Sequence, residues 1–405
     1  MVAPESRVWA APRPPLGAVA ADSNSTATAI AGAILLGTAA LMILGIQPLL
    51  LGALTEDHRL SVAALGRLAT VENLALAAFS AVGSRIMGGP RIRLKATLVC
   101  VALAVANISI YLADTSTSLF VFRSIAGALE GLMLGTAIVV LTSTPHPDRV
   151  NALFLAIQTI PQMVAAYFLP VAIIPRWGSS AGFALLCLVA LVSVAGAWAL
   201  RVPAAVRREP TRAVVPTTWR VLIGLAAVIS QNAGIGGAWN YFEQAGAQRH
   251  FGPNVIGFAL SASLAAQIAG AFFVAWIGWR APYRIVLPIG IAVQTFMVLA
   301  LAQLTNATSY TAIAAGFGLL WLGLQPYQIR QLLTLDATRR SALLVIPLAL
   351  TGLSLGPFAV SFAVDGNDVD GCFRVAAAFL ALSAVLFGAI GKSATAEALP
   401  PGAAL

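Results

Sequence analysis

The chain contains twelve apolar segments that are each long enough to cross a lipid bilayer, and few folds can accommodate so many. A transmembrane helix needs about 20 mostly apolar residues. Strands of a membrane barrel would instead alternate in polarity over about ten residues, a pattern that these segments do not show. The sequence therefore predicts an all-α membrane protein with twelve transmembrane helices. They are expected at 27–54, 61–84, 96–113, 119–143, 152–174, 181–200, 219–244, 255–276, 286–304, 309–332, 342–364 and 372–390.

Composition agrees with a membrane protein and argues against a soluble one. Hydrophobic residues make up 59% of the 405 residues and charged residues only 10%. A soluble chain of this length could not bury so much apolar surface, because its core grows more slowly than its chain. The net charge of +9 does not indicate a nucleic-acid partner, since the basic residues lie in short stretches between apolar segments.

The distribution of the 24 lysines and arginines predicts the topology. Most of them lie in the loops on one side of the predicted helices, and that side is expected to be cytoplasmic. Both termini then lie in the cytoplasm, with disordered tails at 1–26 and 392–405. Nearly all the basic residues are arginines, which is typical of a GC-rich bacterium. The predicted location is a bacterial inner membrane, with the protein as a monomer in the bilayer.

A polar stretch divides the predicted helices into two equal sets. Residues 201–218 contain three prolines and several arginines, and they are expected to form a cytoplasmic linker. The six-helix halves are then 27–200 and 219–391. The sequence Gly-Ile-Gln-Pro at 45–48 and Gly-Leu-Gln-Pro at 323–326 indicates an internal repeat. Two repeated halves around a binding site are the usual plan of secondary transporters.

Local motifs resemble those of the major facilitator superfamily over residues 27–390. The fourth predicted helix contains Arg123 followed by Gly127 and Gly131, similar to the fourth-helix motif of that family. The loop at 83–93 is similar to the family's glycine- and arginine-rich loop, although the usual aspartate is missing, and residues 278–284 repeat it in shorter form. The resemblance implies a two-half bundle that works by alternating access. It does not imply a substrate.

One departure from the family pattern concerns the fifth helix. Family antiporters usually carry a glycine-proline motif there, whereas this helix has Pro161 without a nearby glycine. Drug/proton antiport of the common type is therefore disfavoured.

Three charged residues in the predicted spans are candidates for ion coupling. A charge inside a bilayer costs several kcal/mol unless it is paired or wetted. Arg123 and Glu130 are seven residues apart and share one helix face, and Glu72 lies near the middle of the second helix. Glu130 or Glu72 is expected to exchange a proton, with Arg123 tuning the carboxylate or anchoring an anionic solute. The alternative is that Arg123 pairs permanently with a carboxylate and locks two helices together.

Amides and aromatic residues inside the spans are the candidate substrate-binding residues. Side chains of this kind normally face the interior of a helix bundle, and many only bridge helices. The glycines at 234, 236 and 237 are expected to bend or break the seventh helix beside the binding site. The candidates are Gln47, Gln231, Asn232, Trp239, Asn240, Tyr241, Gln325 and Gln328.

These observations favour a proton-coupled secondary transporter of a small organic, anionic or amphipathic solute. An efflux permease of the same fold stays open, because direction cannot be inferred from these residues. An enzyme is disfavoured, since the sequence shows no nucleophile–base motif. A sensor would need a signalling domain. A metal site is not expected, because the few Cys, His and Met residues are scattered, and no cofactor is predicted.

Overall fold

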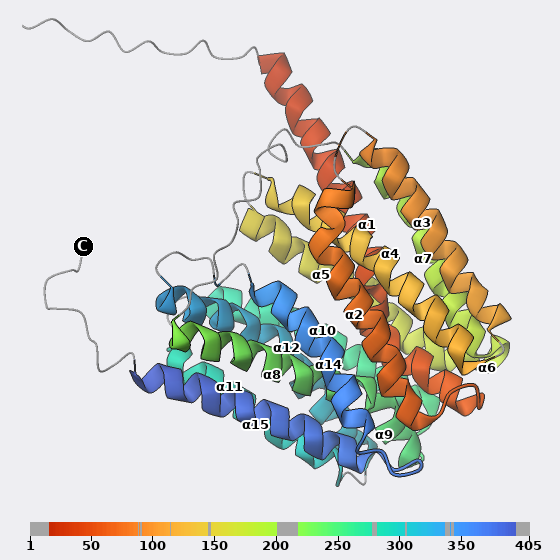
Figure 1. Cartoon of the computed structure of the whole chain (residues 1–405), viewed down its shortest axis with the longest axis vertical. Helices are drawn as coiled ribbons and strands as arrows, with labels where there is room; N and C mark the ends of the chain where they lie inside the picture. The colour runs from red at the N-terminus through yellow and green to blue at the C-terminus, as the bar shows by residue number, and fades with distance from the viewer. Residues whose placement is uncertain are drawn as a thin grey trace, which may run out of the picture.

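The computed structural model describes residues 16–87, 89, 91–113, 115–144, 147–200, 218–277, 282–303, 306–336, 341 and 344–393. The predicted linker therefore lies outside the described residues, apart from its last residue, and so do most of the predicted tails. Within the described chain, α-helices dominate and pack into two groups (Figure 1).

The N-terminal half, up to residue 200, is formed by the first group of helices. α2 packs against α4, α3 against α7, and α1 against α4, α5 and α7. A π-helical turn (Leu169–Ile173) separates α5 from the short α6. The elements are α1 (Leu16–Glu56), α2 (Val62–Met87), α3 (Ile92–Ile108), α4 (Ser116–Thr142), α5 (Pro147–Phe168), α6 (Ile174–Trp177) and α7 (Ser179–Ala199).

The C-terminal half, from residue 218, has its own set of contacts. α10 packs against α12, α8 against α14 and α15, and α11 against α15 and α12. The elements are α8 (Trp219–Asn240), α9 (Phe242–Gln248), α10 (Pro253–Ile277), α11 (Tyr283–Leu301), α12 (Ala307–Leu335), α14 (Val345–Ser361) and α15 (Asp370–Ser393).

The expected membrane spans correspond closely to these helices. Eleven stretches of the described chain are long and apolar enough to cross a membrane. The twelfth predicted span is represented by α14, a shorter apolar helix of 17 residues. The count of twelve crossings therefore depends on α14 and stays a prediction. α1 begins at Leu16, so residues 16–26 are helical, whereas the sequence predicted disorder there.

A second difference concerns the seventh predicted span. The glycines at 234, 236 and 237 lie within an uninterrupted α8, and the helix ends at Asn240 instead. Tyr241 separates α8 from α9 with φ −106° and ψ 5°. The glycines allow close packing: a Cβ at position 236 would lie 2.9 Å from the Cα of Leu353 in α14. Gly236 and Gly237 face α14 and Gly234 faces α15, so the three glycines let α8 lie close to both helices.

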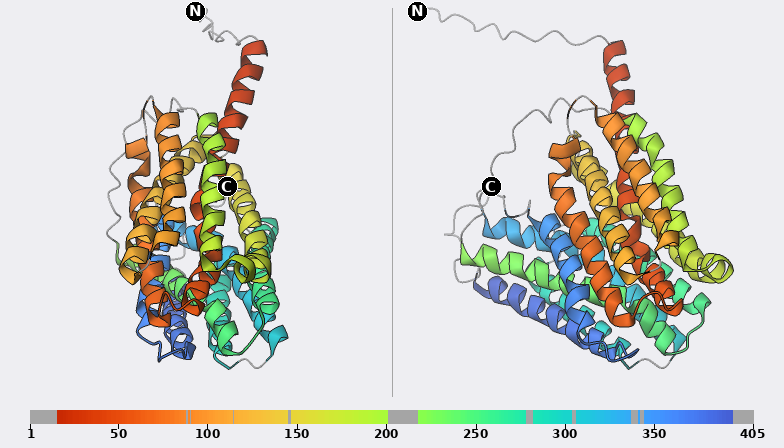
Figure 2. Two further views of the ribbon diagram at one scale, coloured as in Figure 1. Left: turned by 90° about the vertical axis from the view of Figure 1, so that its right-hand side faces the viewer. Right: turned by 45° about the vertical axis from the view of Figure 1, so that its right-hand side comes forward.

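The two halves meet at one end of the molecule and diverge toward the other. In Figure 1 the helices of the N-terminal half run steeply, α8 and α15 of the C-terminal half lie closer to the horizontal, and the two sets converge at the lower right, near α9. Figure 2 shows the same convergence from other directions. We call the region where α1 ends, α2 begins and α8 passes into α9 the α9 end. Contacts between α2 and α14, and between α5 and α10, continue the interface from there.

Glycines also set the spacing between α2 and α4. Gly127, Gly131 and Gly135 of α4 face the backbone carbonyls of Glu72, Leu76 and Ser80 in α2. Small residues at a spacing of four let helix backbones approach closely inside a membrane. This approach brings the charged residues of both helices together.

Gly131→Ala is expected to destabilise the protein by about 1–3 kcal/mol through overpacking. The new methyl group would meet the Leu76 carbonyl and would lie 2.9 Å from Phe79 Cβ, so a helix must shift. Thermal unfolding in detergent measures the effect. Gly316→Ala is the control, because its methyl group would meet only the flexible end of Met297. Equal losses in both variants would contradict close packing of α2 and α4.

Candidate functional site

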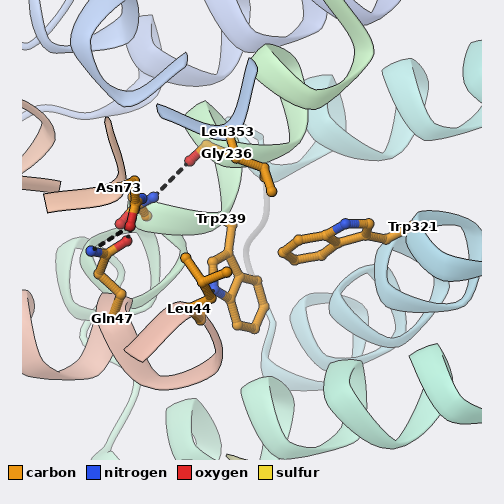
Figure 3. A pocket seen from close by; sticks show the side chains of 8 residues that line it. Leu44, Gln47, Asn73, Gly236, Trp239, Trp321 and Leu353 are labelled. Carbon is orange, nitrogen blue, oxygen red and sulfur yellow. Dashed lines mark hydrogen bonds between the residues drawn. The ribbon is translucent and has the colours of Figure 1, made fainter. Parts of the chain in front are cut away.

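A small pocket lies between the two halves, beside the α9 end (Figure 3). The N-terminal half contributes residues of α1 and α2, and the C-terminal half contributes residues of α8, α12 and α14. A site shared in this way changes shape whenever the halves move relative to each other. The lining residues are Leu44, Gln47, Asn73, Gly236, Trp239, Asn240, Trp321 and Leu353.

Two tryptophans form an apolar corner of the pocket. The rings of Trp239 and Trp321 lie edge to face, with centroids 5.6 Å apart and an interplanar angle of 68°. The indole N–H of Trp239 donates to the backbone carbonyl of Leu44 at 2.8 Å. Because this hydrogen bond occupies the polar edge of Trp239, the ring offers its hydrocarbon surface to the pocket. The same bond also joins the two halves.

Gln47 and Asn73 form a pair of amides on the opposite wall. Asn73 Nδ2 donates to Gln47 Oε1 at 3.0 Å, and Gln47 Nε2 lies 3.3 Å from Asn73 Oδ1. Gln47 Nε2 also donates to Glu72 Oε2 at 3.0 Å. Gln47 therefore connects the pocket to a carboxylate that lies behind it.

Glu72, Arg123 and Glu130 form a buried charge cluster. Arg123 is completely buried and pairs with the Glu72 carboxylate, and the same guanidinium lies 3.6 Å from Glu130 Oε1. Arg123 Nη1 donates to Asn107 Oδ1 at 2.6 Å. The face of the guanidinium lies 5.2 Å from the ring centroid of Phe183. The cluster joins α2, α3, α4 and α7.

The two carboxylates of the cluster are held differently. Both Glu72 oxygens are used, one by Arg123 and the other by Gln47. Glu130 approaches Arg123 only at a distance beyond a good hydrogen bond, and its Oε2 is buried without a hydrogen-bond partner. Adding a proton to Glu130 therefore breaks fewer contacts than adding one to Glu72.

Asn240 lines the pocket and carries an unused acceptor. Its Nδ2 donates to the carbonyl of Gly236 one turn earlier, at 2.9 Å, and its Oδ1 is buried without a partner. Asn232 makes the same local bond to Val228 and also leaves its Oδ1 unpartnered. Only Asn240 of these two lines the pocket.

The remaining predicted binding residues lie elsewhere. Gln231 of α8 accepts from Gln328 Nε2 of α12 and lies 3.4 Å from Gln294 Oε1 of α11, so these amides connect three helices. Gln325 is half-buried and does not line the pocket, although the matching Gln47 does. Their role in binding stays a prediction.

Tyr241 belongs to the contacts that close the α9 end. Its hydroxyl donates to the Val62 carbonyl and accepts from the Gly66 N–H, both at 3.2 Å. Beside it, Gln244 Nε2 donates to Thr55 Oγ1 at 2.7 Å. The buried Glu243 packs against Gly52 of α1. These contacts hold the C-terminal half against the beginning of α2 and the end of α1.

Tyr241→Phe is expected to favour separation of the halves at the α9 end. The change removes two hydrogen bonds, each worth about 1 kcal/mol, so the equilibrium should shift about tenfold or more. Spin labels on the surface ends of α2 and α14 would report the distance distribution. Tyr283→Phe, whose hydroxyl lies on the surface near Thr334, is the control. An unchanged distribution would show that Tyr241 does not hold the halves together.

Sequence reasoning missed several residues of the site. Asn73 and Asn107 were not singled out, although a search for every polar side chain inside an apolar segment would have found both. Leu44 and Leu353 carry no such signal, because apolar residues in the lining look like those elsewhere in the helices.

Comparison with known proteins identifies the fold. No protein-family model matches the chain, and no curated protein does. Solved structures do match. The nucleoside transporter NupG has a TM-score of 0.70 at 13% identity, covering 91% of this chain and 99% of that one. A D-xylose–proton symporter has a TM-score of 0.67 at 15% identity, covering 89% and 96%.

A third match is a bacterial homolog of the human lysosomal transporter Spinster, in an inward-facing and unoccupied conformation. Its TM-score is 0.66 at 13% identity, covering 94% of this chain and 99% of that one. These structures are of transporters in the major facilitator superfamily. The chain has the major facilitator superfamily fold. The resemblance predicted from the helix-four and loop motifs is therefore confirmed at the level of fold.

Proposed function

We propose that the chain is a proton-coupled secondary transporter of a small organic solute in a bacterial inner membrane. The pocket between the halves carries this proposal, because residues of both halves form its wall. Alternating access requires such a site: movement of one half against the other exposes it to one side of the membrane and then to the other. The transporters with similar structures support the general class.

The orientation of this cycle comes from the distribution of basic residues. The linker side carries most of the arginines and is assigned to the cytoplasm, with both termini and twelve crossings. The α9 end then faces the periplasm. Contacts of Tyr241 and Gln244 close that end, so the conformation corresponds to an inward-facing state. The Spinster homolog, described as inward-facing, supports this assignment.

Proton coupling is assigned to the buried charge cluster. Gln47 joins Glu72 to the pocket, and Arg123 joins Glu72 to Glu130. A solute that draws hydrogen bonds from Gln47 would alter the partners of Glu72, and through Arg123 the surroundings of Glu130. Binding and protonation are then linked by direct contacts.

Proton movement in liposomes tests the proposal. The purified protein is placed in vesicles that enclose a pH-sensitive dye, and pools of candidate metabolites are added. A solute-dependent change of internal pH is expected, and its sign gives the direction of solute movement relative to the proton. Absence of any change, with transport of a labelled solute still measurable, would contradict proton coupling. Absence of both would contradict a transporter.

A further inference from the structure

None of the described residues that line the pocket carries a charged side chain. Its eight residues are three amides, two tryptophans, two leucines and one glycine. A solute that enters loses its water, and an ion loses far more solvation energy than a neutral molecule. Without an opposite charge on the wall, nothing offsets the solvation energy that an ion loses.

The buried charge cluster does not supply the missing charge. Arg123 and Glu72 both have no exposed surface, and Gln47 stands between Glu72 and the pocket. The Arg123 guanidinium is already held by Glu72, Asn107 and Phe183. From the pocket, an anionic solute that replaced Glu72 as the partner of Arg123 would have to displace Gln47 as well, and Glu72 would then be buried without its partner. The expectation from sequence that Arg123 anchors an anion is therefore not favoured.

One polar atom among the described pocket residues, Asn240 Oδ1, lacks a hydrogen-bond donor. Asn240 is 2% exposed, and its Oδ1 has no partner. Because its Nδ2 is held by the Gly236 carbonyl, the oxygen is the part of the amide that remains for a ligand. A buried acceptor without a donor costs about 1–3 kcal/mol, which a ligand hydroxyl or N–H would recover.

The tryptophans select the shape of the ligand. Trp239 and Trp321 meet edge to face and present two ring surfaces at a steep angle. Aromatic surfaces of this kind pack against a flat heterocycle or against the hydrocarbon face of a sugar ring. Both kinds of ligand also carry hydroxyl or N–H donors.

We infer that this pocket, which in the present conformation has room for about one water molecule and must widen as the halves move, binds an uncharged, ring-bearing solute that donates a hydrogen bond to Asn240 Oδ1. This inference rests on the proposed function and specifies the substrate class of the same site. Two sources share this chemistry, a free sugar and a nucleoside. The experiment separates them.

Matched pairs of neutral and charged probes test whether the pocket prefers an uncharged solute. Uridine is compared with uridine 5′-monophosphate, and D-glucose with D-glucuronate, by calorimetric titration of the purified protein. The neutral member of at least one pair is expected to bind at least about tenfold more tightly than its charged counterpart. The pair whose neutral member binds more tightly shows whether the ligand is a nucleoside or a free sugar. Equal or tighter binding of a charged member, or no binding by any of the four, would overturn the inference.

Two variants of one helix test the contact with Asn240. Asn240→Leu should weaken binding of the neutral ligand about tenfold, because the buried acceptor is lost. Asn232→Leu is the matched control, since Asn232 makes the same local bond and leaves the same oxygen unpartnered but does not line the pocket. Its affinity should not change. Equal effects of both variants would overturn the assignment of Asn240.

These experiments distinguish failure of the proposed ligand class from failure of the proposed transport function. Neutral ligands that bind but do not cross liposome membranes would contradict the transporter and keep the ligand class. Movement of a charged solute without binding of the neutral probes would keep the transporter and contradict the ligand class.

Discussion

Glu130→Gln is expected to abolish accumulation of the solute while leaving exchange of bound solute intact. One proton moving down a membrane potential of 100 mV supplies about 2.3 kcal/mol, enough for a solute gradient of about 50-fold. Glutamine keeps the size of the side chain but cannot carry the proton. The gradient should therefore fall from about 50-fold to about one, measured with labelled solute in vesicles under an imposed proton gradient.

Glu130 is the better choice for this test because its partners are fewer. Its Oε2 has no hydrogen bond, whereas both oxygens of Glu72 are engaged. Asp368→Asn is the control, since Asp368 lies in an exposed loop, where hydrogen bonds from the Asp370 N–H and the Gln248 amide hold its pKa below the usual value. That variant should accumulate solute normally. Continued accumulation by Glu130→Gln would assign coupling to another group.

The buried charge cluster was largely predictable from the sequence. A charge at membrane depth needs a partner, and Arg123 and Glu130 share a face of one helix. The structure brings both to Glu72 of α2, so the three residues singled out as charges in apolar segments form one cluster. The glycines of α4 at spacings of four already indicated a close helix contact, and α2 is the helix that they contact.

The lining of the pocket was much less predictable. Gln47 and Gln325 occupy matching positions in the short repeat, but only Gln47 lines the pocket. Asn232 and Asn240 lie eight residues apart and make the same local bond, and again only one lines it. Depth along α8 and the position of the opposite half decide between such pairs. Neither the depth along α8 nor the position of the opposite half can be predicted from the local sequence.

The helix ends show the same limit. α1 begins at Leu16, before the apolar segment, and α14 is shorter than the apolar segment that predicted it. Hydrophobicity marks where a span must lie, whereas helix ends depend on local hydrogen bonding. The sequence predicts a bend or break at the glycines 234, 236 and 237, whereas α8 ends at Asn240. Glycine serves both bending and close packing, and only the neighbouring helix shows which.

Arg123→Met is expected to produce the largest loss of stability of any single change proposed for this protein. Removing one partner from a buried ion pair costs about 3–5 kcal/mol, because the other charge stays buried without compensation. Here the change leaves Glu72 with only Gln47 as a partner, and it also removes the nearest cation from Glu130. The free energy of unfolding in mixed detergent measures the loss.

A partial rescue separates this charge effect from lost packing. Arg123→Met combined with Glu72→Gln removes both charges of the pair and should recover at least half of the lost stability, because no unpaired Glu72 charge remains. The Arg249–Asp370 pair, 2.8 Å apart with side chains 12% and 25% exposed, provides the reference. Arg249→Met there should cost no more than about 1 kcal/mol, since water screens the charges that remain. Two results would contradict the charge effect: an Arg123→Met loss no larger than that of Arg249→Met, or a double variant less stable than Arg123→Met alone. Either result would mean that Arg123 holds the helices mainly by packing on Phe183.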